Sequence, residues 1–345
     1  MPISFASNAV LTKTRAMFGK RLMPGDYNLL LAQHSVSQVA GILKQHPGYE
    51  HFLDDINEGT VHRLQLEERL RQKHFENFES FARYELSAGE KLADYIIRKS
   101  ELELIIEALT RIKSANTSPT VFFIPAFLDR HIGIDTPALE KAQTFEDLLQ
   151  AVRDSFFYET LLPLAPTASS NPDIATYENI LYSELYQQLF RQISRIASSE
   201  CRKELTDMIV SYLDLENLVR IYRLKVFFNA SPEYILNHLL PGGSIPEKRL
   251  RTMTESPKGT LLQLAQEGKI HPSLQKDFRY TVPDELPKRY LGKISIHNIR
   301  YSDHPPVVML SYLYFSDIEI SNIIKIVEGC RYQLPAEQVR KMLIL

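Results

Sequence analysis

Paired carboxylates are the first residues in this sequence that could do acid–base chemistry. Asp54 and Asp55 are adjacent, and adjacent side chains of a helix point in different directions, so they make a poor acid–base pair. Glu101 and Glu103 offer a second pair two residues apart. Solvated or helix-capping roles account for both pairs, and the sequence predicts no catalytic residues.

Histidines could bind a metal or transfer protons, and the chain has ten of them, widely scattered. His46 and His51 are five residues apart, and His297 and His304 are seven apart. Neither pair has the partners that a zinc site requires. The sequence therefore predicts no metal site, and solvated or core histidines account for these residues.

Nucleotide chemistry would require a glycine-rich phosphate loop ending in Gly-Lys and a hydroxyl residue. Three Gly-Lys pairs occur, at Gly19-Lys20, Gly268-Lys269 and Gly292-Lys293, and all lack both the upstream glycine and the hydroxyl residue. The chain also has no G-x-S-x-G and no H-E-x-x-H sequence, the signatures of a nucleophile elbow and a zinc protease. We expect no cofactor and no ATP binding through a phosphate loop.

A modest basic patch is the remaining candidate for binding. Arg220, Arg223 and Lys225 flank one helical apolar stripe. A solvated helix face explains them equally well; the functional interpretation is a contact with an acidic surface of a partner protein.

Helices must position these residues. Residues 9–44 and 59–113 have apolar side chains at three-to-four spacing with charges between them, and helices resume at about residue 174,. Prolines at 163–172 and the sequence Pro241-Gly242-Gly243 predict breaks,. No run alternates apolar and polar residues long enough for a strand, so we predict an all-α fold.

A motif that occurs three times is the most informative feature of the chain. It opens with the acids Glu101, Asp214 and Glu319, which are 113 and 105 residues apart. We call these three residues the repeat acids. A proline follows each acid at a similar distance, at 119, 232 and 335. Ser231 before Pro232 is typical of a helix N-cap followed by a first helical residue.

An apolar stripe at i, i+3, i+4 and i+7 follows each acid, which places its members on one helix face. Any amphipathic helix has such a stripe, but the second and third copies also share Asn217 with Asn322 and Arg220 with Lys325. The first copy has Leu104 in place of the asparagine. The predicted repeat core is Leu102, Ile105, Ile106 and Leu109, then Leu215, Leu218, Val219 and Tyr222, then Ile320, Ile323, Ile324 and Val327.

Three related helical units of about one hundred residues are predicted from this period. The boundaries are residues 1–116, 117–244 with a linker at 163–172, and 245–345. Three similar units favour a pseudo-threefold body that closes around a central opening.

Composition limits the function classes. The net charge of −2 argues against a nucleic-acid-binding protein dominated by phosphate contacts,. The longest apolar stretches, 121–128 and 307–315, are shorter than the roughly 20 residues that span a membrane. No secretory signal is visible, and Cys201 and Cys330 have no motif context. We expect a soluble protein of a reducing compartment.

Three blocks of this sequence resemble one protein family. Asp214-Leu-Glu-Asn-Leu-Val-Arg-Ile-Tyr-Arg-Leu-Lys225, with Ser231–Leu236 and Pro241–Gly243, is similar to the middle of the d-subunit family of V-type (vacuolar/archaeal-type) ATPases, whose bacterial and archaeal members carry the letter C. Ile318–Lys325 followed by Leu334–Arg340 resembles the end of that family, and Asn8–Leu31 resembles its opening helices. The linker at 163–172 has no counterpart that we can match.

The resemblance implies three similar helical domains around a pseudo-threefold axis, forming a funnel. It implies a non-catalytic central-stalk subunit whose mouth receives the rotor shaft, made of the D and F subunits, and whose opposite face sits on the membrane rotor ring. The expected place is the cytoplasmic face of the membrane, in a complex that couples ATP to H⁺ or Na⁺ transport. No small-molecule substrate and no nucleic acid are expected.

Two other function classes remain open from the residues alone. One is a helical scaffold or adaptor protein unrelated to a rotary ATPase. The other is a helical enzyme with an unrecognised site, which would require a pocket where titratable groups converge.

Overall fold

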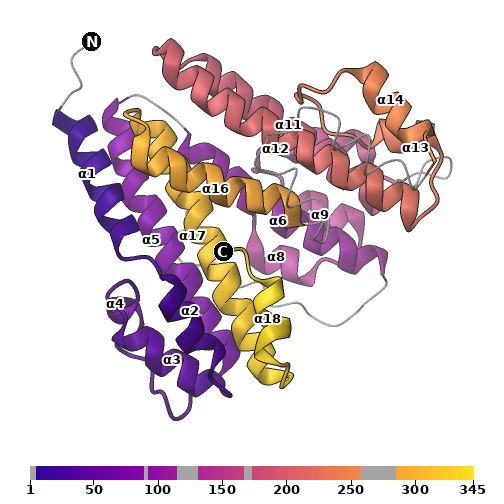
Figure 1. Cartoon of the computed structure of the whole chain (residues 1–345). Coiled ribbons are helices and arrows are strands. Elements are labelled where there is room, and N and C mark those ends of the chain that lie inside the picture. Colours follow the sequence, from indigo (N-terminus) through magenta and orange to yellow (C-terminus); the bar gives the residue numbers. More distant parts are fainter. Residues whose placement is uncertain (1–4, 89–91, 115–130, 167–172, 258–284) are drawn as a thin grey trace. The chain divides into compact units, whose positions relative to one another are not determined.

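The computed structural model describes residues 5–88, 92–114, 131–166, 173–257 and 285–345 (Figure 1). All regular structure in these ranges is helical and none of it is strand, so the predicted all-α fold is confirmed for them. The trailing Pro119 and residues 167–172 of the predicted linker lie outside these ranges. Contacts divide the chain into unit 1, which is Met1–Glu90 with Lys288–Leu345, and unit 2, which is Lys91–Pro287.

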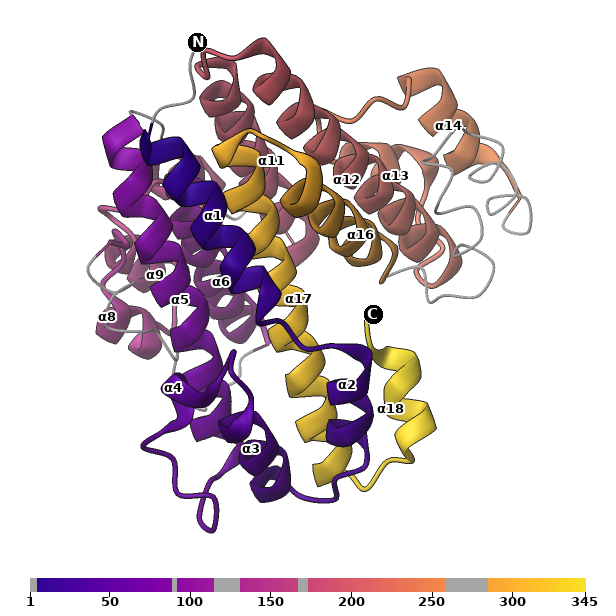
Figure 2. The same ribbon diagram turned by 60° about the vertical axis from the view of Figure 1, so that its left-hand side comes forward.

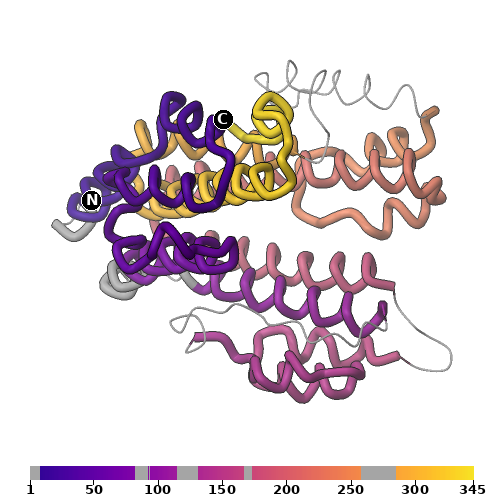
Figure 3. The backbone as a smooth tube through the Cα atoms, turned by 90° about the horizontal axis from the view of Figure 1, so that it is seen from below, coloured from indigo at the N-terminus to yellow at the C-terminus, as the bar shows by residue number. Residues whose placement is uncertain are grey.

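Unit 1 combines the two ends of the chain. Its helices are α1 (Phe5–Gly19), α2 (Pro24–Leu31), α3 (Val36–Gln45), α4 (Glu50–Leu53), α5 (Arg63–Ala88), α16 (Leu286–Tyr301, from Lys288 on), α17 (Pro305–Arg331) and α18 (Ala336–Met342). The long helix α17 contacts α1, α3, α5 and α18 (Figure 2). Helix α18 also contacts α2, so the first and last segments of unit 1 lie side by side (Figure 3).

Helix α17 is long and apolar enough to cross a membrane by length and composition. However, 78% of its most apolar 18-residue window is buried inside the protein. Helices α1, α3 and α5 cover it, and its polar Asn322 and Glu319 are buried with internal hydrogen bonds. We therefore interpret α17 as the core helix of unit 1.

Unit 2 is also built on long helices with short ones between them. They are α6 (Ala93–Lys113), α8 (Thr136–Lys141), α9 (Phe145–Ala151), α10 (Tyr158–Leu161), a 3₁₀ turn (Leu162–Leu164), α11 (Ile174–Ser194), α12 (Ser199–Val226), α13 (Pro232–Asn237) and α14 (Glu247–Glu255). Helix α6 packs on α11 and α9, and α12 contacts α11, α13 and α14.

Side chains at the helix starts explain where several of these helices begin. Asp173 accepts a hydrogen bond from the backbone N–H of Thr176 and caps α11, and Ser198 caps α12 in the same way,. Ser231 caps α13, with Pro232 as the first helical residue, as the sequence predicted,.

The two-unit division differs from the three predicted repeats. Both predicted boundaries, at 116/117 and 244/245, fall inside unit 2, because α6 packs on α11 and α14 on α12 and α13. The repeats nevertheless remain a prediction, because compactness is a different property from internal similarity. The contacts of the repeat acids give a more direct comparison.

Candidate functional site

Each of the three repeat acids is buried and accepts hydrogen bonds from the backbone of a loop. Glu101 accepts from the N–H of Gly133 at 2.6 Å. Asp214 accepts from the N–H groups of Ser244 at 2.8 Å and Ile245 at 3.1 Å. Glu319 accepts from the N–H of Leu22 at 2.8 Å. Charge-assisted bonds of this kind satisfy a carboxylate that would otherwise be costly to bury.

The three receiving loops hold equivalent places in the fold. Gly133 precedes α8, Ile245 precedes α14 and Leu22 precedes α2, so each acid on a long helix fixes the start of a short one. In the third repeat the loop is separated from its acid by 297 residues in the chain. Burial raises the pKa of Glu101, and the hydrogen bond from Gly133 acts in the opposite direction.

The shared asparagines make a second equivalent contact. The side-chain amide of Asn217 donates to the carbonyl of Leu240 at 2.9 Å and accepts from its N–H at 2.7 Å. Asn322 forms the same pair of bonds with Ile344, at 2.7 and 2.9 Å. Leu104 of the first repeat cannot form such a pair, since its side chain is apolar.

Two of the three residues of the predicted basic patch, Arg220 and Lys225, donate to backbone carbonyls of the protein itself. Arg220 donates to the carbonyl of His238 at 3.0 Å, after the end of α13, and Lys325 donates to Met342 at the end of α18 at 2.6 Å. Cations there neutralise the partial negative charge of a helix C-terminus. Arg220 and Lys325 are therefore a third pair of equivalent contacts, in the second and third repeats. Through this contact the charge of Arg220 stabilises the end of α13,.

Lys225 is also internal, and its role as a partner contact stays a prediction. The residue is 8% exposed, and its ammonium group donates to the carbonyls of Met253 at 2.8 Å and Thr254 at 2.6 Å, at the end of α14. Arg223 alone of the three predicted residues is exposed.

The predicted stripes lie mostly inside. Nine of the twelve residues are buried, and Ile106, Tyr222 and Ile324 are partly buried. The stripes therefore face the cores of their units. Surfaces for partners must be sought elsewhere.

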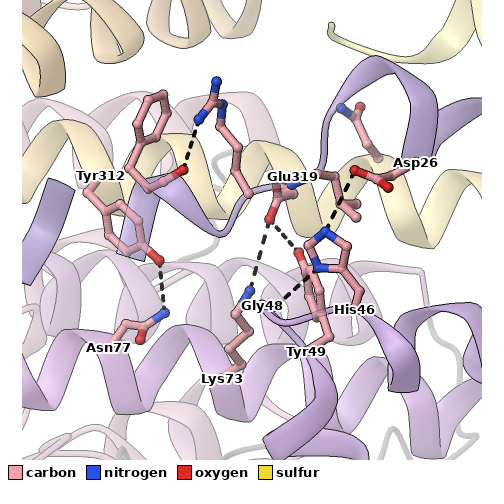
Figure 4. A network of polar contacts seen from close by, with 12 residues as sticks. Asp26, His46, Gly48, Tyr49, Lys73, Asn77, Tyr312 and Glu319 are labelled. Atoms are coloured by element: carbon pink, nitrogen blue, oxygen red, sulfur yellow. Dashed lines mark hydrogen bonds and ion pairs between the residues drawn. The ribbon is translucent and has the colours of Figure 1, made fainter. Parts of the chain in front are cut away.

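Glu319 belongs to a larger polar network in unit 1 (Figure 4). Its Oε1 accepts a hydrogen bond from the hydroxyl of Tyr49 at 2.5 Å and lies 4.0 Å from Nζ of Lys73. That ammonium lies 3.5 Å from the centre of the Tyr49 ring. Burial, reinforced by the charge of Glu319, raises the pKa of Tyr49 well above its ordinary value. Burial lowers the pKa of Lys73 to about 8, although Glu319 acts in the opposite direction.

The loop that Glu319 holds has a second support. Asp26 accepts from the N–H of Met23 at 2.7 Å and lies 3.6 Å from Nε2 of His46 (Figure 4). The other ring nitrogen of His46 accepts from the N–H of Gly48 at 3.1 Å, which favours the tautomer with its proton on the nitrogen facing Asp26. Sequence reasoning missed Tyr49 and Lys73 because neither lies in a repeated motif.

Unit 2 contains a cavity of about 850 Å³ between α11, α12 and α13. Tyr182, Tyr186 and Tyr212 line it in series, with ring centres 6.3 and 6.2 Å apart. Burial raises the pKa of Tyr182 to about 12. This wall is aromatic, and the raised pKa keeps the Tyr182 hydroxyl protonated near neutral pH.

The titratable groups at one end of this cavity are engaged by the protein itself. Asp173 accepts from the hydroxyl of Tyr234 at 2.7 Å while capping α11. His238 contacts the carbonyl of Tyr234 at 2.7 Å and the hydroxyl of Thr176 at 3.3 Å. In the part of the chain that the structure describes, no three histidine, cysteine or acidic side chains come together as a metal site would require. The contacts described above hold loops and short helices to the long helices of each unit.

The family model described as "ATP synthase (C/AC39) subunit" matches residues 10–342. The C subunit of the A-type ATP synthase of Archaeoglobus fulgidus is 22% identical over 344 residues, covering 97% of this chain and 95% of that protein.

Proposed function

Because the chain belongs to the ATP synthase (C/AC39) subunit family, we propose that it is the central-stalk subunit that couples the soluble rotor shaft of a V/A-type ATPase to the membrane ring. It does no bond chemistry in this role. The shaft subunits, of D and F type, enter one face and the ring of ion-translocating subunits holds the other, at the cytoplasmic face of the membrane. In this role the three repeats form a funnel around the axis on which the shaft and the ring turn. The match over 10–342 carries the proposal.

The hydrogen bonds that hold loops to the long helices of the repeats support a mechanical role. A coupler must transmit torque without bending at its loops. The acids Asp214 and Glu319 tie the start of one short helix, α14 or α2, to a long helix. Asn217 and Asn322 tie the segment that follows another short helix, α13 or α18, to the same long helix. Close-packed helical interiors resist compression. Loops are usually more mobile than the helices they connect, so hydrogen bonds that hold loops to the long helices stiffen the chain there.

The ends of the long helices supply exposed side chains for partner contacts. Phe227 and Phe228 at the end of α12 are 69% and 70% exposed, and Tyr332 after α17 is 62% exposed. Arg223 is exposed one turn before Phe227. Exposed aromatic and arginine side chains are typical anchors of protein interfaces. We place shaft contacts at the α12 end, formed by Arg223, Phe227 and Phe228.

Co-purification tests this function. The tagged chain, co-expressed with shaft and ring subunits, should recover both, while the chain alone should hydrolyse no ATP. The double variant Arg223→Glu, Phe228→Asp should lose the shaft subunits and keep its fold by circular dichroism. Lys141→Glu, an exposed cation elsewhere in unit 2, is the matched control. Failure to recover either partner with the unaltered chain would favour a scaffold unrelated to the rotor.

A further inference from the structure

Unit 1 encloses a second, smaller cavity of about 320 Å³. Its wall comes from the α1–α2 loop, the α3–α4 region, α5 and α17, and includes Lys20, Arg21, Lys73, Asn77, Tyr312 and Glu319. A cavity of this volume has room for several water molecules,. That volume is enough for a small solute but too little for a helix of a partner protein.

Lys73 is the unusual group in this wall. The residue is 7% exposed, and an ammonium group has three N–H donors. Among the described residues, Nζ has the Glu319 carboxylate at 4.0 Å and the Tyr49 ring at 3.5 Å, and neither is a hydrogen bond. The Glu319 carboxylate already accepts hydrogen bonds from the N–H of Leu22 and the hydroxyl of Tyr49. A buried cation without acceptors is costly.

Two neutral donors beside Lys73 are also underused. Nδ2 of Asn77 reaches the Tyr312 hydroxyl only at 3.5 Å and keeps a second N–H,. Burial and Glu319 raise the pKa of Tyr312 far above its ordinary value, so the hydroxyl keeps its proton. The described residues supply no acceptor for that proton. Lys73, Asn77 and Tyr312 therefore present N–H and O–H donors to the cavity that the described residues leave unused.

The mouth of the cavity adds two further cations. Lys20 is exposed and has no ion pair among the described residues. Arg21 bonds the Phe18 carbonyl through one nitrogen and stacks 4.2 Å from the Phe18 ring, which leaves its other N–H groups. The acids on this wall are Glu50, which is exposed, and Glu319. Three cations thus face two acids.

We propose that this cavity is a binding site for a small oxyanion of the phosphate type, free or as a small monoester, with Lys73, Asn77 and Tyr312 as buried donors and Lys20 and Arg21 at the mouth. A tetrahedral dianion has enough acceptor oxygens for several donors at once. Bound there, it joins the α1–α2 loop to α5 and α17 and stabilises unit 1 by mass action.

Calorimetric titration of the full chain with sodium phosphate at pH 7 tests the site, with sodium chloride at matched ionic strength as the reference. Glycerol 3-phosphate in a second arm separates a monoester from free phosphate as the preferred form. Saturable binding of either one, accompanied by a higher melting temperature, is expected. Heats and melting temperatures no different from those in chloride overturn the proposal.

Variants locate the binding. Lys73→Met and Tyr312→Phe should each weaken it by ~10-fold or more, as expected for a buried hydrogen bond to a charged group. Lys20→Gln, at the exposed mouth, should weaken it by ~3-fold. Lys341→Gln, an exposed lysine on α18, should bind as the unaltered chain does. Because Lys73→Met could impair folding, Tyr312→Phe and Lys20→Gln serve as independent tests. Unchanged affinity in all folded variants overturns the proposal.

Discussion

The side-chain amide of Asn217 pairs with both backbone groups of one residue, Leu240, which lies 23 positions further along the chain. Asn322 repeats this arrangement with Ile344, 22 positions along. In both repeats the paired residue follows a short helix, α13 or α18. The clamp therefore fixes the direction in which the chain leaves that helix, and it is the clearest structural support for internal repetition of the second and third copies.

Removing the clamp should be costly. Asn322→Ala leaves the buried N–H and C=O of Ile344 without partners, so we expect a loss of ~2–4 kcal/mol in the free energy of unfolding. Urea denaturation followed by circular dichroism measures it. Gln338→Ala, an exposed amide on α18, should change stability little. Equal effects of the two substitutions would show that the amide pair contributes nothing.

Glu319 should not be replaceable by its isosteric amide. Glu319→Gln places an NH₂ group against either the Leu22 N–H or the Tyr49 hydroxyl, both of which donate to the carboxylate. Loss of one charge-assisted bond predicts a destabilisation of ~1–3 kcal/mol. Glu337→Gln, whose side chain is 82% exposed, is the matched control, and the comparison uses thermal and urea unfolding. A stable Glu319→Gln protein would contradict this role.

The apolar stripe of the third repeat should tolerate no charge. Ile323 is fully buried in the core of unit 1, so Ile323→Asp buries an unpaired carboxylate and should cost at least ~3–5 kcal/mol. We expect loss of the cooperative melting transition of unit 1. Leu64→Asp makes the same kind of change at a position that is 72% exposed and should leave the transition in place.

The lowered pKa of Lys73 predicts that the free energy of unfolding rises with pH. Its folded-state pKa is about 8, against an ordinary value of 10.5. Between these values the unfolded chain binds a proton that the folded chain has released, so the free energy of unfolding rises with pH. From pH 7.5 to 9.5 the gain is about 2 kcal/mol.

Tyrosines limit this window at its upper end. Burial raises the pKa of Tyr27 and Tyr49 in the folded state, so above about pH 10 the unfolded chain loses their protons first and stability falls. The difference in unfolding free energy between the unaltered chain and Lys73→Met isolates the lysine. That difference should grow between pH 7.5 and 9.5 in chloride buffer. A constant difference would mean that Lys73 titrates normally.

The sequence by itself determined the helices and the identity of the repeated positions. A period of 3.6 residues is a local property, so the stripes, the N-cap Ser231 and the break at Pro241-Gly242-Gly243 could be read without a structure. The absence of a phosphate loop and the resemblance in three ordered blocks followed from the residues as well. The burial of Asp214 and Glu319 was not predicted, because a charged residue at the start of a stripe can equally face water.

Only the tertiary structure decided what the charged residues do. Arg220 and Lys225 are residue types that usually lie on the surface. In the structure Arg220 donates a hydrogen bond to the carbonyl of His238, and Lys225 donates to those of Met253 and Thr254. The partner of Glu319 is 297 residues away, and Lys73 is buried beside it. A carboxylate or ammonium finds its partner through the packing of distant segments, where water is excluded and hydrogen bonds must be satisfied internally. Local spacing carries no record of that packing.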